Sequence, residues 1–176
     1  QGYSGSLNEF FDDCSWNEAV LKPAVSGAGR HTYRINQGNI KTYEKIFRDL
    51  IKDEAMMLQE YQNNITDFGE AAFMVFNGKF SHAIIKKAKK GDFRVQDDFG
   101  GSVYPYEASE EEIKFAEEVT ASISPVPVYS RVDMIKDNHN KPAIGELELI
   151  EPELWFRFHP PAADLFAEAI IEKYFR

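Results

Sequence analysis

The sequence contains a single cysteine, Cys14, among its 176 residues. No disulfide can therefore form within the chain, and a lone thiol without a second cysteine or a histidine cluster offers no zinc site. Positive charge is also scarce, because 20 basic residues face 29 acidic ones and give a net charge of −9. This balance argues against a nucleic-acid-binding protein, which would present a basic face.

Long apolar runs are missing as well. No stretch approaches the roughly 18 apolar residues of a membrane span, and the first residues lack the basic and apolar regions of a signal peptide. We therefore expect a cytoplasmic protein without membrane segments. The pattern GxxxxGK[ST] is absent too, so a P-loop fold is not supported. Apolar residues make up 43% of the chain, enough for one sizeable core in one domain or two lobes.

Apolar periodicity and turn signals predict an α+β fold. We expect residues 1–18 to be irregular and residues 88–106 to form a surface loop. Asn77-Gly78 between two apolar runs predicts a tight hairpin turn. The predicted strands are 19–21, 31–35, 56–61, 70–76, 80–87, 126–135 and 143–150, and the predicted helices are 40–52, 109–123 and 161–175. Because these elements do not alternate regularly as βαβ units, the order is typical of an α+β protein.

Lys22 lies at a strand end just before the turn Ser26-Gly27-Ala28-Gly29. A lysine held on a strand can place its ammonium against a phosphate, and glycines let backbone N–H groups approach phosphate oxygens. A plain hairpin with a solvated lysine explains the same residues, so both interpretations stay open.

Two further segments suggest ligand contacts. Gln59, Glu60 and Tyr61 end a strand, where main-chain groups could pair with an adenine edge, although any strand end offers the same. A basic run contains Lys86, Lys87, Lys89 and Lys90, and a solvated face is the better explanation for Lys87, Lys89 and Lys90. Arg94 differs, because it stands between apolar neighbours and its planar guanidinium suits a carboxylate or phosphoryl group.

The strongest candidate is an acidic group formed by Asp133, Glu146 and Glu148, with Glu151 just beyond. Residues two apart on a strand share a face, so Glu146 and Glu148 project together. If the two strands pair, Asp133 lies close to them. Three carboxylates on one patch repel unless protonated or bridged by cations, and their oxygens suit Mg²⁺. The alternative is the acidic outer face of an ordinary sheet.

Taken together, five segments resemble a known family. VLKPAVSGAGRHT is similar to a strand lysine with a glycine-rich phosphate loop, and LQEYQNNITDFGE to a hinge strand that holds adenine. KKAKKGDFRVQDDFGG is the most specific match, and RVDMI with IGELELIEP resembles a pair of metal-binding strands. The resemblance, over about residues 21–151, is to the C-terminal half of the ATP-grasp superfamily, especially bacterial glutathione synthetase.

The resemblance implies an ATP-grasp fold, with two α+β lobes whose antiparallel sheets hold ATP between them. It divides the chain into a lead-in at 1–18 from a missing upstream region, part of the first lobe at 19–61, and a second lobe with the metal site at 62–176. The implied activity is that of an ATP-dependent carboxylate-amine ligase acting through an acylphosphate, with ATP and Mg²⁺ as cofactors. Small carboxylates and amines are the expected partners, and such ligases are often homo-oligomers.

The resemblance also implies roles for individual residues. Lys86 and Arg94 would be the catalytic residues, in contact with phosphate and substrate, and Asp133, Glu146 and Glu148 would bind Mg²⁺. The ATP contacts would be Lys22, Ser26, Gly27, Ala28, Gly29, Gln59, Glu60, Tyr61 and Glu70. For Glu70, a solvated strand end is an equal alternative.

Two departures from the family bear on function. The last metal ligand is usually asparagine, where this chain has Glu148, and the family's upstream lysine and N-terminal substrate domain have no counterpart here. Glutathione is therefore doubtful as the product. A non-catalytic nucleotide-binding module, or an inactive fragment of such a ligase, is the alternative function. No role is implied for Glu151.

Overall fold

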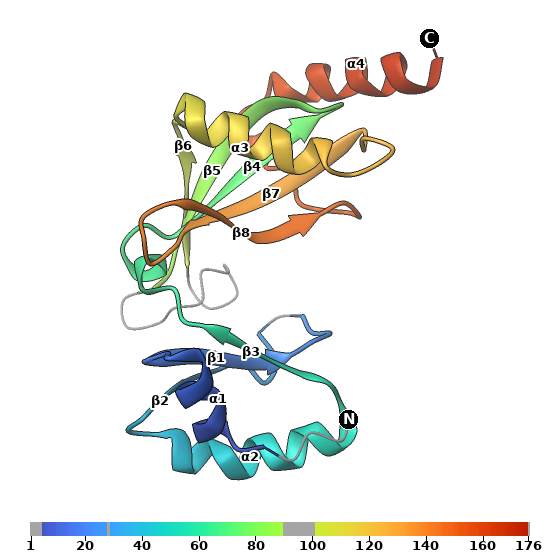
Figure 1. The fold of residues 1–176 in the computed structure, drawn as a ribbon. Helices are drawn as coiled ribbons and strands as arrows, with labels where there is room; N and C mark the ends of the chain where they lie inside the picture. The colour runs from blue at the N-terminus through green and yellow to red at the C-terminus, as the bar shows by residue number, and fades with distance from the viewer. Residues whose placement is uncertain (1–4, 28, 90–100, 176) are drawn as a thin grey trace. The chain divides into compact units, whose positions relative to one another are not determined.

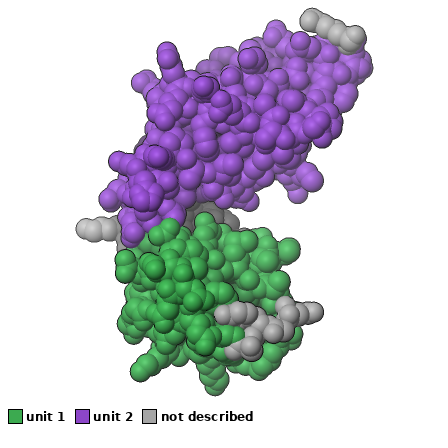
Figure 2. All heavy atoms as spheres, in the orientation of Figure 1, with its two compact units in different colours: residues 1–61 green, residues 62–176 purple. Residues whose placement is uncertain are grey.

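The computed structural model describes residues 5–27, 29–89 and 101–175, which fold into the helices and strands of Figure 1. The chain divides into two units, residues 1–61 and residues 62–176, coloured separately in Figure 2. Each unit has its own antiparallel sheet and its own helices. The prediction of an α+β fold is confirmed.

The first unit is a three-stranded sheet covered on one face by two helices. The strand order is β2-β1-β3, with β1 at Glu18–Pro23, β2 at Tyr33–Asn36 and β3 at Met56–Glu60. Burial alternates along β1, so Ala19 and Leu21 point into the core while Lys22 lies on the opposite face. The predicted strands at 19–21 and 31–35 are confirmed and pair as an antiparallel hairpin, and the predicted helix at 40–52 is confirmed as α2 at Ile40–Asp53.

The first helix, α1 at Leu7–Cys14, corrects the expectation that residues 1–18 are irregular. Ser6 and Glu9 form a reciprocal capping box, in which each side chain accepts a hydrogen bond from the other residue's backbone N–H. Leu7 and Phe11, one turn apart, are buried against the sheet. Local capping and two core contacts therefore suffice to make this short segment helical.

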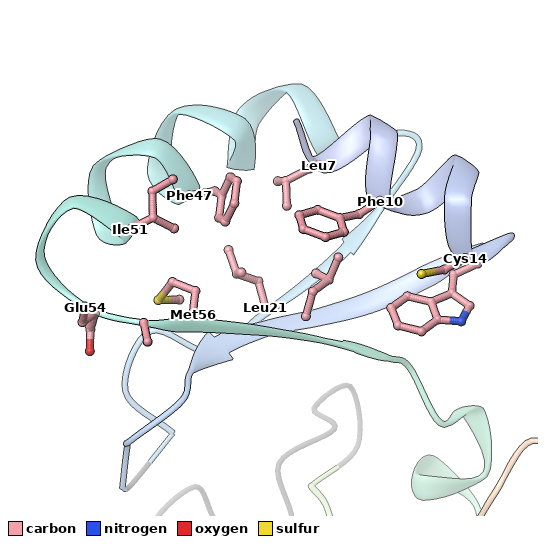
Figure 3. A pocket seen from close by; sticks show the side chains of 11 residues that line it. Leu7, Phe10, Cys14, Leu21, Phe47, Ile51, Glu54 and Met56 are labelled. Atoms are coloured by element: carbon pink, nitrogen blue, oxygen red, sulfur yellow. The ribbon is translucent and has the colours of Figure 1, made fainter. Parts of the chain in front are cut away.

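An apolar pocket of about 350 Å³ lies within the first unit, between α1, α2 and the sheet (Figure 3). Phe10 and Phe47 line it from the two helices, and Leu21 and Met56 line it from the strands. Cys14 lies at its edge as a free, exposed thiol, as the sequence predicts.

The second unit is built on a five-stranded antiparallel sheet of order β6-β5-β4-β7-β8. These strands span Ser102–Tyr106 (β6), Lys79–Lys87 (β5), Glu70–Phe76 (β4), Tyr129–Lys136 (β7) and Pro142–Glu148 (β8). Asn77 and Gly78 make the predicted tight turn, with φ of 47° and 80°. Positive φ at both residues is what such hairpin turns require.

Two helices cover opposite faces of this sheet. Helix α3, at Glu110–Ala121, packs on the face that carries Phe73, Val75 and Met134. Helix α4, at Ala162–Phe175, and the segment before it pack on the other face, over Met74 and Ile84. The predicted helices at 109–123 and 161–175 are thus confirmed. Short 3-10 turns, η1 at Asn63–Thr66 and η3 at Phe156–Phe158, occur in the connections.

Strand β6 corrects the expectation of a loop over 88–106. Residues 102–106 pair with β5, with Tyr104 opposite Ile85. Pro105 is tolerated because β6 is an edge strand, where an imino nitrogen need not donate to a neighbour. Residues 90–100 of the expected loop lie outside the described part of the chain.

In the described ranges, no helix has both the length and the apolar character that a membrane crossing needs.

Candidate functional site

The three acidic residues singled out from the sequence lie together in the second unit. Strands β7 and β8 pair with Asp133 opposite Glu146 and with Arg131 opposite Glu148. Directly opposite residues share a face, so all four side chains project from one side of the sheet. One carboxylate oxygen from each of the three acids lies within 4.8 Å of the others. The strand pairing expected from the sequence therefore holds, and it gathers the carboxylates.

A β-bulge at Gly145 sets this alignment. Asp133 pairs with Glu146, but the next residue, Met134, already pairs with Ile144, so β8 carries one extra residue. A Cβ at position 145 would lie 3.3 Å from the Asp133 backbone oxygen and 3.5 Å from a Glu70 carboxylate oxygen. Glycine thus allows strand β8 and the Glu70 side chain to approach closely.

Two cations lie among these carboxylates. Lys86 Nζ donates to Glu70 Oε1 at 2.6 Å and to Asp133 Oδ2 at 2.8 Å. Arg131 binds Asp133 with two nitrogens, Nε to Oδ1 at 2.8 Å and Nη2 to Oδ2 at 2.9 Å, and Nη2 also contacts Glu148. Together with the three acids, these residues form what we call the charged cluster: Glu70, Lys86, Arg131, Asp133, Glu146 and Glu148.

Burial differs strongly within the charged cluster. Asp133 is fully buried, and Lys86 and Arg131 are 8% and 7% exposed. Glu148 is half-buried, whereas Glu146 is exposed and takes part in no hydrogen bond or ion pair observed among the described residues. An ion arriving from solvent would therefore meet Glu146 first.

Burial and charge shift several pKa values in the cluster. Burial raises the pKa of Glu70, with Lys86 opposing and Asp133 adding to the rise. Burial also raises the pKa of Glu148, and the Arg131 guanidinium only partly offsets it. For Lys86, burial works to lower the pKa, but the Asp133 and Glu70 carboxylates outweigh it and raise the pKa. Several shifted pKa values in one patch are typical of functional sites.

The sequence interpretation missed Arg131 and misjudged the surroundings of Glu70. Arg131 stands two residues before Asp133 on a strand, and this spacing alone places both side chains on one face. Glu70 was expected to contact adenosine or solvent, and here it holds Lys86. The two residues are direct partners in the β4–β5 hairpin, in a register that a bulge between Met74 and Val75 sets and that the sequence did not reveal.

The predicted ATP contacts of the first unit lie on its three-stranded sheet and the β1–β2 turn. Lys22 and Gln59 are on the sheet face that carries no helix, because Lys22 pairs with Met57 and Val20 pairs with Gln59. Ser26 and Gly27 are exposed in the turn, and Gly29 adopts a φ of 67°. Ala28 and Arg94 lie outside the described residues.

The main-chain groups of Glu60 and Tyr61, at the end of strand β3, point in different directions. The Tyr61 backbone N–H donates to the Glu18 carbonyl at 3.0 Å, so it belongs to the sheet and does not face a ligand. By strand alternation, the main-chain groups of Glu60 point away from β1. The Tyr61 ring is 3% exposed and lies under the Arg34 guanidinium, 3.9 Å from its centroid. Of the predicted hinge residues, Glu60 is the better placed for an adenine edge.

Comparisons with known proteins identify the family of the chain. The family model of the prokaryotic glutathione synthetase ATP-grasp domain matches residues 4–138. The cycloserine biosynthesis protein DcsG of Streptomyces lavendulae is 26% identical over 171 residues, which cover 89% of this chain and 55% of DcsG. The chain thus spans little more than half the length of this relative.

Solved structures show the same fold. The crystal structure of D-cycloserine synthetase DcsG matches with a TM-score of 0.78 at 25% identity, over 94% of this chain and 59% of that one. D-alanine-D-alanine ligase from Bacillus anthracis, complexed with ATP, matches with a TM-score of 0.63 at 18% identity, over 98% and 56%. The ATP-grasp ligase PsnB, complexed with a precursor variant, Mg and ADP, matches with a TM-score of 0.64 at 14% identity, over 93% and 49%. The latter two likenesses concern the fold alone.

Proposed function

Because this chain belongs to the family of the prokaryotic glutathione synthetase ATP-grasp domain, we propose that it is the Mg-ATP-binding part of a carboxylate-amine ligase. The observation that carries the proposal is the charged cluster, in which three carboxylates gather beside Lys86 and Arg131 on one sheet face. A site with both signs of charge suits a reaction that joins divalent ions, phosphates and a carboxylate substrate.

The proposed reaction has two steps. A substrate carboxylate oxygen attacks the γ-phosphorus of ATP, and the bond to the bridging oxygen breaks to release ADP and leave an acylphosphate. An amine nitrogen then attacks the carbonyl carbon, phosphate departs with the bonding electron pair, and the amine loses a proton. The first step is a phosphoryl transfer, in which the protein acts mainly by positioning and by stabilising charge.

Magnesium fits the donor set of the cluster. Asp133, Glu146 and Glu148 offer carboxylate oxygens close enough to share ions, and hard oxygen ligands are those that Mg²⁺ prefers. When bound, Mg²⁺ neutralises phosphate charge and aligns the transferred group. Glu148 replaces the family's usual asparagine and would supply an additional negative charge to the same position.

The cations of the cluster would act on the anionic substrates. Arg131 presents a guanidinium whose fork already binds carboxylates, so it is suited to an oxyanion that develops at the carbonyl carbon. We keep Arg94 as a second candidate for this role, and Lys86 as a phosphate contact. In the first unit, Lys22 and the turn with Ser26, Gly27, Ala28 and Gly29 would orient the phosphates.

The remaining predicted contacts concern adenosine. The adenine contacts at Gln59, Glu60 and Tyr61 stay predictions, and the main chain of Glu60 is the best placed of the three because the Tyr61 backbone N–H already donates to the Glu18 carbonyl. Glu70 would support the site through Lys86, and its contact with adenosine stays a prediction.

The test is ADP release by the intact protein, supplied with Mg-ATP and panels of amino acids, dipeptides and hydroxy acids. Glu146→Gln removes one predicted metal ligand that pairs with no cation in the described ranges, so it should abolish Mg²⁺-dependent turnover without unfolding the protein. Glu111→Gln, the same change at an exposed site on α3, is the matched control. Equal turnover by both variants would refute the metal assignment.

A second function, nucleotide binding without ligation, is favoured by the saturation of Asp133 with internal cations. Calorimetric titration of the intact protein with Mg-ATP separates the alternatives in combination with the ADP assay. Both functions predict binding, but only the ligase produces ADP when a carboxylate and an amine are present.

A further inference from the structure

The Lys86 ammonium lies between two carboxylates, at a position where a metal ion could also bind. It bridges Glu70 and Asp133 at 2.6 Å and 2.8 Å, and its side chain is 10% exposed. A lysine that is buried between two carboxylates acts as their counter-ion and does not belong to a solvated basic face. The sequence had suggested a solvated face for its neighbours in the run.

Asp133 has little capacity left for another partner. A carboxylate has about four lone-pair positions, and hydrogen bonds from Lys86 Nζ, Arg131 Nε and Arg131 Nη2 use three of them. A divalent ion at the remaining position would share this carboxylate with two cations at close range. Like charges so near each other in a buried setting repel strongly.

Arg131 and Lys86 differ in how easily they could move away from Asp133. Arg131 is held by two nitrogens on Asp133 and by a contact to Glu148. Lys86 is held by a single nitrogen at the end of a flexible four-carbon chain. A change of rotamer would therefore move the ammonium away from Asp133 while the guanidinium stays in place.

We propose that Lys86 is a tethered counter-ion of the metal site, which neutralises Asp133 and Glu70 in the free protein and leaves Asp133 when a divalent ion binds. This inference rests on the proposed function, because it takes the three carboxylates as the metal ligands. Its consequence is that the free protein binds metal weakly. Lys86, once released, places its charge where nucleotide phosphates arrive.

The first test measures Mn²⁺ binding to the nucleotide-free intact protein, since Mn²⁺ takes the same oxygen ligands as Mg²⁺ and is visible by electron paramagnetic resonance. Lys86→Met should bind Mn²⁺ at least about tenfold more tightly than the unaltered protein, because a competing cation is gone. Lys79→Met is the matched control on the same strand, at an exposed position seven residues away, and should change the affinity less than about twofold.

The second test needs no substitution, so it remains decisive if Lys86→Met does not fold. Lysine amines of the intact protein are acylated with and without saturating Mn²⁺, and the modified residues are mapped by mass spectrometry. Lys86 should be protected in the free protein and become several-fold more reactive with Mn²⁺, while Lys79 is unchanged. Unchanged or lower reactivity of Lys86 on Mn²⁺ binding would overturn the proposal.

Failure of the counter-ion role differs from failure of the metal site. If Mn²⁺ binds, Glu146→Gln abolishes binding, and Lys86→Met leaves the affinity unaltered, the counter-ion role is wrong and the metal site stands. If neither the unaltered protein nor Lys86→Met binds Mn²⁺, both proposals are wrong.

Discussion

Replacing Lys136 tests how strongly helix α3 is held to the sheet of the second unit. Lys136 Nζ, at the end of β7, donates to Glu112 Oε1 at 2.6 Å. Glu112 also accepts from the Ser109 backbone N–H at 3.0 Å and from the Tyr106 hydroxyl at 3.1 Å. One carboxylate, 5% exposed, therefore ties the start of α3 to β7 and β6.

The loss of stability caused by Lys136→Met depends on which hydrogen bonds Glu112 keeps in the variant. Breaking a buried ion pair costs roughly 3–5 kcal/mol when the remaining charge has no other partner. Here two hydrogen bonds to the carboxylate remain, so we expect a loss of about 2 kcal/mol in the free energy of unfolding. Lys114→Met on α3 is the control, because that lysine is 77% exposed and 3.7 Å from Glu118. It should cost less than about 0.5 kcal/mol.

The dependence on pH has a definite sign. Burial works to raise the pKa of Glu112, but hydrogen bonds from Lys136, Ser109 and Tyr106 outweigh it, so the pKa lies below its ordinary value of 4.5. The stability contributed by the ionised carboxylate is thus fully present above about pH 4.5 and is lost as the pH falls through the lowered pKa of the folded protein. The cost of Lys136→Met should shrink over that same range.

The assay is urea unfolding followed by tryptophan fluorescence. Both tryptophans of the chain are informative, since Trp16 lies in the first unit and Trp155 in the second. With Trp16→Phe in every variant, the signal follows the second unit alone, which keeps the two transitions separate. The reasoning is wrong if Lys136→Met costs no more than Lys114→Met at pH 7, or if its cost stays constant as the pH falls below 4.5.

Three further outcomes are expected. Phe73→Ala should cost about 3–5 kcal/mol in urea unfolding because its ring is fully buried, whereas Phe175→Ala, at 79% exposure, should cost under about 0.5 kcal/mol. Gly145→Ala should weaken Mn²⁺ binding to the nucleotide-free protein several-fold by crowding the charged cluster. Gly27→Ala, where a Cβ meets nothing within 4 Å, should leave Mn²⁺ binding to the nucleotide-free protein and the free energy of unfolding unchanged. Burial lowers the pKa of His82, so stability should fall as the pH drops below 6.5, and His82→Asn should flatten that slope when unfolding is measured between about pH 7 and pH 5.

Local signals in the sequence predicted most elements of the fold. The Asn-Gly turn, the capping serine of α3 and the two-residue spacing of Glu146 and Glu148 each act within a few residues, where sequence and structure are directly linked. The helix α1 had a comparable signal in Ser6 and Glu9, and it was missed because the segment is short and largely polar. Strand β6 was missed because Pro105 and preceding glycines argue for a loop unless the strand is known to be an edge.

The charged cluster shows why the rest of the site could not be predicted. Lys86 and Asp133 are 47 residues apart along the chain, and they meet only because β4 lies between β5 and β7. Nothing within either segment specifies that order. The acids alone suggested a solvated patch or a metal site. The spacing of Arg131 and Asp133 could have indicated one of the buried cations, but the sequence contained no sign that Lys86 binds the same carboxylate.

The buried position of Asp133 links stability to metal binding. A fully buried carboxylate without cations would be costly, so the metal-free protein needs both Lys86 and Arg131 beside Asp133. The same cations oppose a divalent ion. Lys86→Met should therefore lower the stability of the metal-free protein while raising its affinity for Mn²⁺, and added Mn²⁺ should restore stability by mass action. Such a site would bind a metal ion most tightly together with an anion, because the anion can pair with the Lys86 ammonium that the metal ion displaces.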